Sequence, residues 1–119
     1  MPGLRHVESR LLAGSESLCA PGLLRLETLH VLRTLANQVG QPAADRMVER
    51  FLDLDIVYYA EDILVRRVWK LRHNLTAYDA AYVALAELLD APLLTRDQPL
   101  SRATGHKARI EYVALAAAG

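Results

Sequence analysis

Residues 75–97 read LTAYDAAYVALAELLDAPLLTRD, and this stretch decides the fold. Residues 76–89 predict a helix whose only charge between Thr76 and Ala86 is Asp79. Residues 92–95 predict a short apolar strand, and Asp97 follows it closely. A helix that leads directly into a strand is typical of an α/β fold.

The two aspartates are expected to lie near each other. A helix from Tyr78 to Asp90 spans roughly 19 Å at about 1.5 Å per residue. The strand from Pro92 to Asp97 returns roughly 20 Å at about 3.3 Å per residue. Asp79 and Asp97 should therefore lie at one edge of the sheet, the carboxyl ends of the strands, where open α/β folds bind ligands.

The rest of the chain alternates in the same way. Helical patterns cover residues 4–13, 23–38, 43–54 and 61–72, and strand patterns cover 17–20, 56–59 and 110–113. This alternation predicts one α/β domain with a parallel sheet over residues 1–113, followed by a tail at 114–119. Five aromatic residues in these elements are expected in the core: Phe51, Tyr58, Tyr59, Trp69 and Tyr82.

A third acid is expected at the same edge. Glu27 lies in the second turn of the 23–38 helix and borders its apolar arc. Three converging carboxylates favour Mg²⁺ or Mn²⁺ over zinc. The sequence leaves open that Asp79 and Asp97 only cap helices and that Glu27 is a surface glutamate.

Composition narrows the classes of function. The chain has 119 residues, 52% of them hydrophobic, and 14 basic residues balance 14 acidic ones. No strong overall field therefore draws it to nucleic acid or membrane. With Cys19 alone and no zinc-type ligand spacing or transmembrane run, we expect a soluble cytoplasmic protein with no membrane partner.

Three segments carry a family resemblance: LCAPGLLRLETLHVLRTL, LRHNLTAYDAAYVALAELL and APLLTRDQPLSR. Together they resemble PIN-domain ribonucleases, most closely the VapC-type toxins of toxin–antitoxin pairs. The resemblance runs from about Leu4 to Val113 and implies a three-layer α/β/α fold with a parallel sheet.

The resemblance implies a Mg²⁺-dependent endoribonuclease that cuts single-stranded RNA, dimerises and is silenced by a bound antitoxin. The family's acidic residues fall on Glu27, Asp79 and Asp97, which would hold the metal while a metal-bound water attacks the phosphate. Thr95 is expected to support this site by hydrogen bonding. Arg96, Arg102 and Lys107 are the RNA-binding candidates, because phosphate contacts come mainly from Arg and Lys.

One departure from the family concerns its first strand. Family members begin with a hydrophobic strand that ends in an aspartate, whereas MPGLRHVESRLL matches the family's next helix. We therefore expect the usual first, central strand and its aspartate ligand to be missing. Five explanations stay open for the missing strand: a start placed too far downstream, a fragment of a longer chain, a decayed copy, neighbouring strands that close the gap, and a partner chain that supplies the strand.

Two other functions remain possible from the sequence. A catalytically impaired PIN-like module would dimerise or bind an antitoxin without cleaving RNA. A Mg²⁺-dependent phosphatase or receiver-like domain would need a phosphoacceptor aspartate after a first strand, which this chain does not show. The metal-dependent ribonuclease is the main hypothesis.

Overall fold

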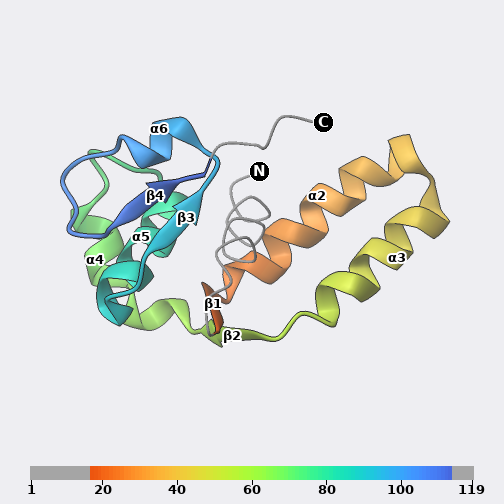
Figure 1. Ribbon diagram of the computed structural model, residues 1–119, viewed down its shortest axis with the longest axis horizontal. Helices are drawn as coiled ribbons and strands as arrows, with labels where there is room; N and C mark the ends of the chain where they lie inside the picture. The colour runs from red at the N-terminus through yellow and green to blue at the C-terminus, as the bar shows by residue number, and fades with distance from the viewer. Residues whose placement is uncertain (1–16, 114–119) are drawn as a thin grey trace.

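The computed structural model describes residues 17–113, and Figure 1 shows their arrangement. The elements in chain order are β1 (Leu18–Pro21), α2 (Leu23–Val39), α3 (Gln41–Leu52), β2 (Ile56–Tyr59), the 3₁₀ helix η1 (Glu61–Ile63), α4 (Val65–Lys70), α5 (Ala77–Leu89), β3 (Leu93–Thr95), α6 (Gln98–Ser101) and β4 (Ile110–Tyr112). The predicted α/β class is confirmed. The predicted helix at 4–13 and the tail at 114–119 lie outside the described residues.

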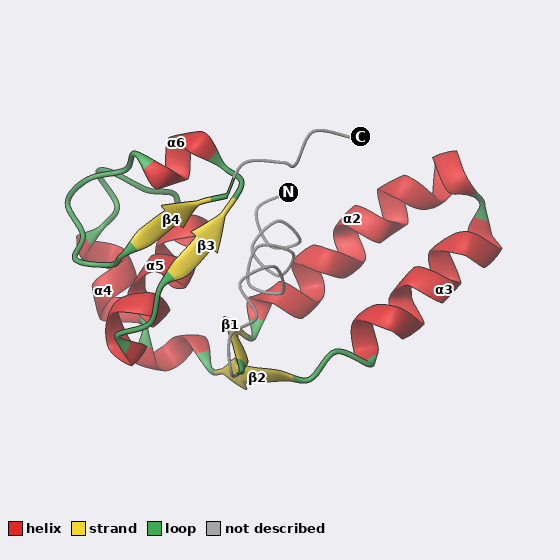
Figure 2. Ribbon diagram, viewed as in Figure 1, coloured by secondary structure: helices red, strands yellow, loops and turns green. Residues whose placement is uncertain are grey.

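The strands form two separate parallel pairs (Figure 2). In the first pair, β1 lies beside β2 with Leu18 opposite Ile56; in the second, β3 lies beside β4 with Leu93 opposite Ile110. The predicted parallel pairing is confirmed. However, the described strands do not join into one sheet, because no ladder of hydrogen bonds links β1 to β3.

Helix α5 packs against both pairs and forms the centre of the core. Every residue from Ala80 to Ala86 is buried, and its side chains contact β1 and β3. Ala80 and Val83 share one hydrophobic cluster with Ala20 of β1 and Leu93 of β3. The alanines of α5 let the strands approach its backbone closely, so a single helix holds the two pairs together.

Helices α2 and α3 form a hairpin that extends away from the strands (Figure 1). Gly40 joins them with a positive φ of 87°, a conformation that favours glycine, and Pro42 lies in the first turn of α3. Several large apolar side chains on this hairpin are exposed, including Leu26 at 73% and Leu52 at 61%.

Three sequence expectations need correction. The helix expected at 61–72 is divided into η1 and the shorter α4, because Leu64 has a φ of −104° between them. The helix expected at 43–54 runs from Gln41 to Leu52. Trp69 is not a core residue: it is 65% exposed, and the Arg72 guanidinium lies 4.2 Å from its ring centre. None of the residues of α4 is buried, so this helix lies at the surface and leaves Trp69 exposed.

The loop before β4 is attached to α5 by a charged network. Arg67 donates two hydrogen bonds to the Glu87 carboxylate, at 2.6 and 2.8 Å. The backbone N–H of Lys107 donates a third, at 2.6 Å. These bonds to Arg67 lower the pKa of Glu87 below its ordinary value, although burial acts in the opposite direction.

We expect Glu87→Gln to lower the free energy of unfolding by about 1–2 kcal/mol at pH 7, because it removes charge-assisted hydrogen bonds. A carboxyl group whose pKa is lowered by folding stabilises the fold above its unfolded value, here 4.5. That contribution is lost as the pH falls through the folded pKa. Urea unfolding of both proteins at pH 7 and pH 3 should therefore show a difference that shrinks at pH 3; a difference independent of pH would contradict this assignment.

Candidate active site

Three acidic residues come from three different elements. Glu27 lies on α2, Asp79 in the first turn of α5, and Asp97 two residues after β3. Asp79 interacts electrostatically with Glu27 on one side and with Asp97 on the other. Asp79 is therefore the acid that interacts with both of the others.

Asp79 is the most constrained of these carboxylates. Its backbone N–H donates to the Thr76 hydroxyl at 3.2 Å, so Thr76 caps α5. Its Oδ1 is buried and has no hydrogen-bond partner. Burial first, and the charge of Asp97 second, raise the pKa of Asp79, while hydrogen bonding to Thr76 lowers it.

Glu27 is held by a buried tyrosine. The Tyr82 hydroxyl donates a hydrogen bond of 2.6 Å to Glu27 Oε1. Burial raises the pKa of Glu27, the bond from Tyr82 lowers it, and the charge of Asp79 raises it. The pKa of Tyr82 is raised by burial and by this bond, so the phenol stays protonated and acts as the donor.

Asp97 caps a helix, which is the alternative that the sequence left open, although α6 itself was not among the predicted elements. Its Oδ1 accepts a hydrogen bond from the Leu100 backbone N–H at 3.3 Å, which caps α6. Its own N–H donates to the Thr95 hydroxyl at 3.0 Å. Thr95 is completely buried, so its hydroxyl fixes the turn that carries Asp97.

The donor set suits magnesium better than zinc. Within residues 17–113, no group of three or more His, Cys, Asp or Glu side chains is arranged so that it could hold a metal ion as it stands. Asp79 instead interacts electrostatically with Glu27 and with Asp97 separately. Mg²⁺ is commonly bound by one or two carboxylates together with waters and substrate phosphates, and the unpartnered Oδ1 of Asp79 fits that role.

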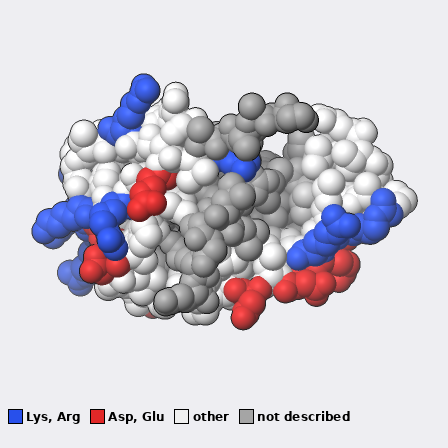
Figure 3. Space-filling view, in the orientation of Figure 1, with Lys and Arg blue, Asp and Glu red and all other residues white. Residues whose placement is uncertain are grey.

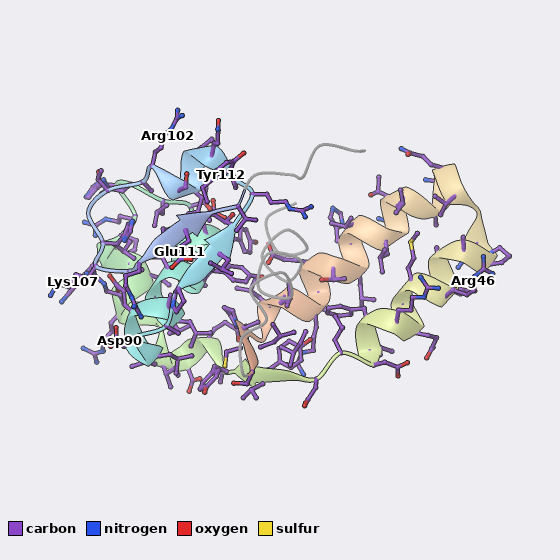
Figure 4. The ribbon with its side chains drawn as sticks, viewed as in Figure 1. Arg46, Asp90, Arg102, Lys107, Glu111 and Tyr112 are labelled. Carbon is purple, nitrogen blue, oxygen red and sulfur yellow. The ribbon has the colours of Figure 1, made fainter. Side chains whose placement is uncertain are left out.

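The three basic candidates are placed differently. Arg96 is half-buried beside Asp97, and Arg102 is exposed at the end of α6. Lys107 is exposed in the loop before β4, at the amino end of that strand and beside the far end of α5. Figure 3 shows basic side chains along this end of the molecule, and in Figure 4 Arg102 and Lys107 point away from each other. The structure therefore does not bring Lys107 together with the acids.

Tyr82 is a functional candidate that the sequence analysis assigned to the core alone. It is only 4% exposed, so that assignment is confirmed, but its hydroxyl reaches Glu27 on another helix. One signal was present in the sequence: Tyr82 follows Asp79 by three residues and so shares its helix face.

Comparisons with known proteins identify the family of this chain. The family model described as PIN domain matches residues 4–105. Ribonuclease VapC1 of Mycobacterium tuberculosis is 41% identical over 97 residues, which cover 79% of this chain and 73% of that protein. Ribonuclease VapC9 of the same organism is 41% identical over 100 residues, covering 82% and 79%. Ribonuclease VapC3 of Pyrobaculum aerophilum is 42% identical over 57 residues, covering 48% of this chain and 44% of that protein.

No helix within the described part of the chain is both long and apolar enough to cross a membrane.

We expect Asp79→Asn to raise the melting temperature of the metal-free protein by a few degrees at pH 7. A carboxyl group whose pKa is raised by folding stabilises the fold below its unfolded value, here 3.8, and this contribution is lost as the pH rises through the folded pKa. The gain from removing the charge should therefore disappear near pH 3. Calorimetry of wild type and Asp79→Asn at pH 7 and at pH 3 measures this difference in melting temperature.

Asp90→Asn is the matched control, because the Asp90 side chain is 97% exposed at the far end of α5. It should leave the melting temperature nearly unchanged at both pH values. If Asp79→Asn destabilises the protein equally at pH 7 and pH 3, the Asp79 charge is not the source of the expected effect.

Proposed function

This chain belongs to the PIN-domain family as a VapC-type protein, and on that premise we propose that it is a Mg²⁺-dependent endoribonuclease toxin that cleaves single-stranded RNA. The observation that carries the proposal is Asp79, whose buried Oδ1 lacks a hydrogen-bond partner and which interacts electrostatically with both Glu27 and Asp97. Its relatives from Mycobacterium tuberculosis, which are named ribonucleases, support the reaction class.

Glu27, Asp79 and Asp97 are the residues that would hold the cation, Mg²⁺ or Mn²⁺. When bound, such an ion supplies Lewis-acid polarisation of a phosphate oxygen and lowers the pKa of a water ligand. The protein's own contribution is to fix the carboxylates. Thr76 fixes the start of α5, Thr95 fixes the turn before α6, and Tyr82 fixes Glu27.

RNA is expected to lie along the side of the acids that carries α6. Arg96 follows β3 directly, and Arg102 ends α6, so both could neutralise phosphates next to the cleaved bond. Lys107, at the other end of β4, would contact only a more distant part of the RNA.

Two exposed apolar surfaces support the proposal that this chain binds protein partners. One is on the α2–α3 hairpin, with Leu26, Leu29 and Leu52 exposed, and we propose that the antitoxin covers it.

The other surface is a groove of about 390 Å³ between α4 and the start of α5, bordered by Trp69 and Tyr78. Trp69 and Tyr78 are 65% and 63% exposed, and we propose that they pack against a second copy of this chain. These contacts also suit the alternative function, a catalytically impaired or truncated PIN-like module that dimerises or binds an antitoxin.

The enzymatic proposal predicts cleavage of end-labelled single-stranded RNA in Mn²⁺ and none in EDTA. Asp79→Asn and Asp97→Asn should each reduce the rate by at least about 100-fold, because each removes charge stabilisation of the transition state. Asp90→Asn, which removes an equal charge far from the site, should cleave like wild type. A duplex of the same sequence should be cut more slowly.

The alternative function makes the opposite prediction for that assay. A folded wild-type protein that leaves the RNA intact in Mn²⁺, or whose cleavage survives both Asp79→Asn and Asp97→Asn, would exclude these acids as the catalytic site.

The proposed dimer is tested at Trp69. Because Trp69 is largely exposed within one protomer, Trp69→Asp should fold normally while placing a charge in the apolar contact. Light scattering after gel filtration should give a dimer for wild type and a monomer for Trp69→Asp. Leu52→Asp, on the other exposed surface, should remain a dimer. A Trp69→Asp protein of dimeric mass would show that the copies associate elsewhere.

A further inference from the structure

The hydrogen bond between Tyr82 and Glu27 joins two helices that carry different acids. Tyr82 and Asp79 lie on one face of α5, three residues apart, whereas Glu27 lies on α2. The bond is short, at 2.6 Å, and the tyrosine that donates it is buried in the main hydrophobic cluster. Core packing therefore fixes the position of the donor.

We propose that Tyr82 is a positioning residue, which holds the Glu27 carboxylate in the orientation needed to bind the divalent cation. This inference rests on the proposed function. The Tyr82 hydroxyl occupies Oε1 of Glu27, so Oε2 is the oxygen that would coordinate the cation. The phenol itself does not contact the cation or the RNA.

The physical reason is the flexibility of glutamate. An exposed glutamate loses rotamer freedom when it is fixed on a metal, and this loss weakens binding. The bond from Tyr82 fixes Glu27 before the cation arrives. Partners of this kind, which orient a ligand without touching the metal, typically change affinity by about 10–100-fold.

The structure also explains why the donor comes from α5. The two strand pairs are not joined by hydrogen bonds in the described residues, so they do not fix α2 relative to β3 through a continuous sheet. Helix α5 contacts both β1 and β3. A donor on α5 therefore places Glu27 relative to Asp79 directly.

The test is Mn²⁺ affinity, measured by electron paramagnetic resonance of the free ion. We expect Tyr82→Phe to bind Mn²⁺ about 10-fold more weakly than wild type. Phenylalanine keeps the buried ring, so the metal-free melting temperature should change little. Tyr59→Phe is the control. It removes the hydroxyl of a tyrosine that packs against a cluster formed by Leu64, Ala81, Ala84 and Leu85, and it should bind Mn²⁺ like wild type.

A second pair of variants separates positioning from a general effect. If Tyr82 acts through Glu27, adding Tyr82→Phe to Glu27→Ala should cause no further loss of Mn²⁺ affinity. A full additional loss in that background would overturn the proposal. So would wild-type affinity in Tyr82→Phe, or a large drop in its metal-free melting temperature, which would assign the hydroxyl to the fold.

The outcomes also separate the proposed function from the proposed role of Tyr82. Wild-type protein that binds no Mn²⁺ would overturn both the proposed function and the role of Tyr82. Wild-type protein that binds Mn²⁺ and cleaves RNA, beside a Tyr82→Phe variant with unchanged affinity, would overturn the role of Tyr82 alone.

Discussion

The packing of α5 against both strand pairs positions every other part of the site. Seven consecutive residues of this helix are buried, and they contact β1 on one side and β3 on the other. Since the described strands form no ladder across the gap between the pairs, apolar contact with α5 replaces the hydrogen bonds that a continuous sheet would supply. The start of α5 and the end of β3 then meet, which places Asp79 beside Asp97.

Three neighbouring carboxylates repel one another and so destabilise the metal-free fold. Asp79 is partly buried next to two other carboxylates, and burial and the charge of Asp97 both raise its pKa. Like charges held together destabilise the fold, and a divalent cation would relieve the repulsion. Functional sites commonly keep such unfavourable groups, with stability supplied elsewhere. Here the buried alanines and leucines of α5, and the ion pair between Arg67 and Glu87, supply part of it.

The sequence predicted the elements and the proximity of Asp79 and Asp97 because both depend on local rules. Helix rise, strand rise and the alternation of apolar segments are properties of short stretches of chain. It did not predict α6, because that helix is only four residues long and depends on the Asp97 cap. The sequence predicted a parallel sheet without its usual central strand, and the described strands form two parallel pairs with no ladder between them.

Side-chain roles that depend on two elements were the hardest to predict. Tyr82 fits an apolar helix face, and only the structure shows that its hydroxyl reaches Glu27. Trp69 fits a helical pattern as well, but α4 has no buried residue and leaves it exposed. In the same way, Lys107 is close to Arg102 in sequence, yet the two side chains point in different directions (Figure 4).

The most direct measurement is anomalous diffraction from crystals grown with Mn²⁺. The account predicts an anomalous peak within bonding distance of an Asp79 oxygen, with Glu27 or Asp97 as a second ligand. A peak that excludes Asp79, or an empty site at Mn²⁺ concentrations that support RNA cleavage, would contradict it.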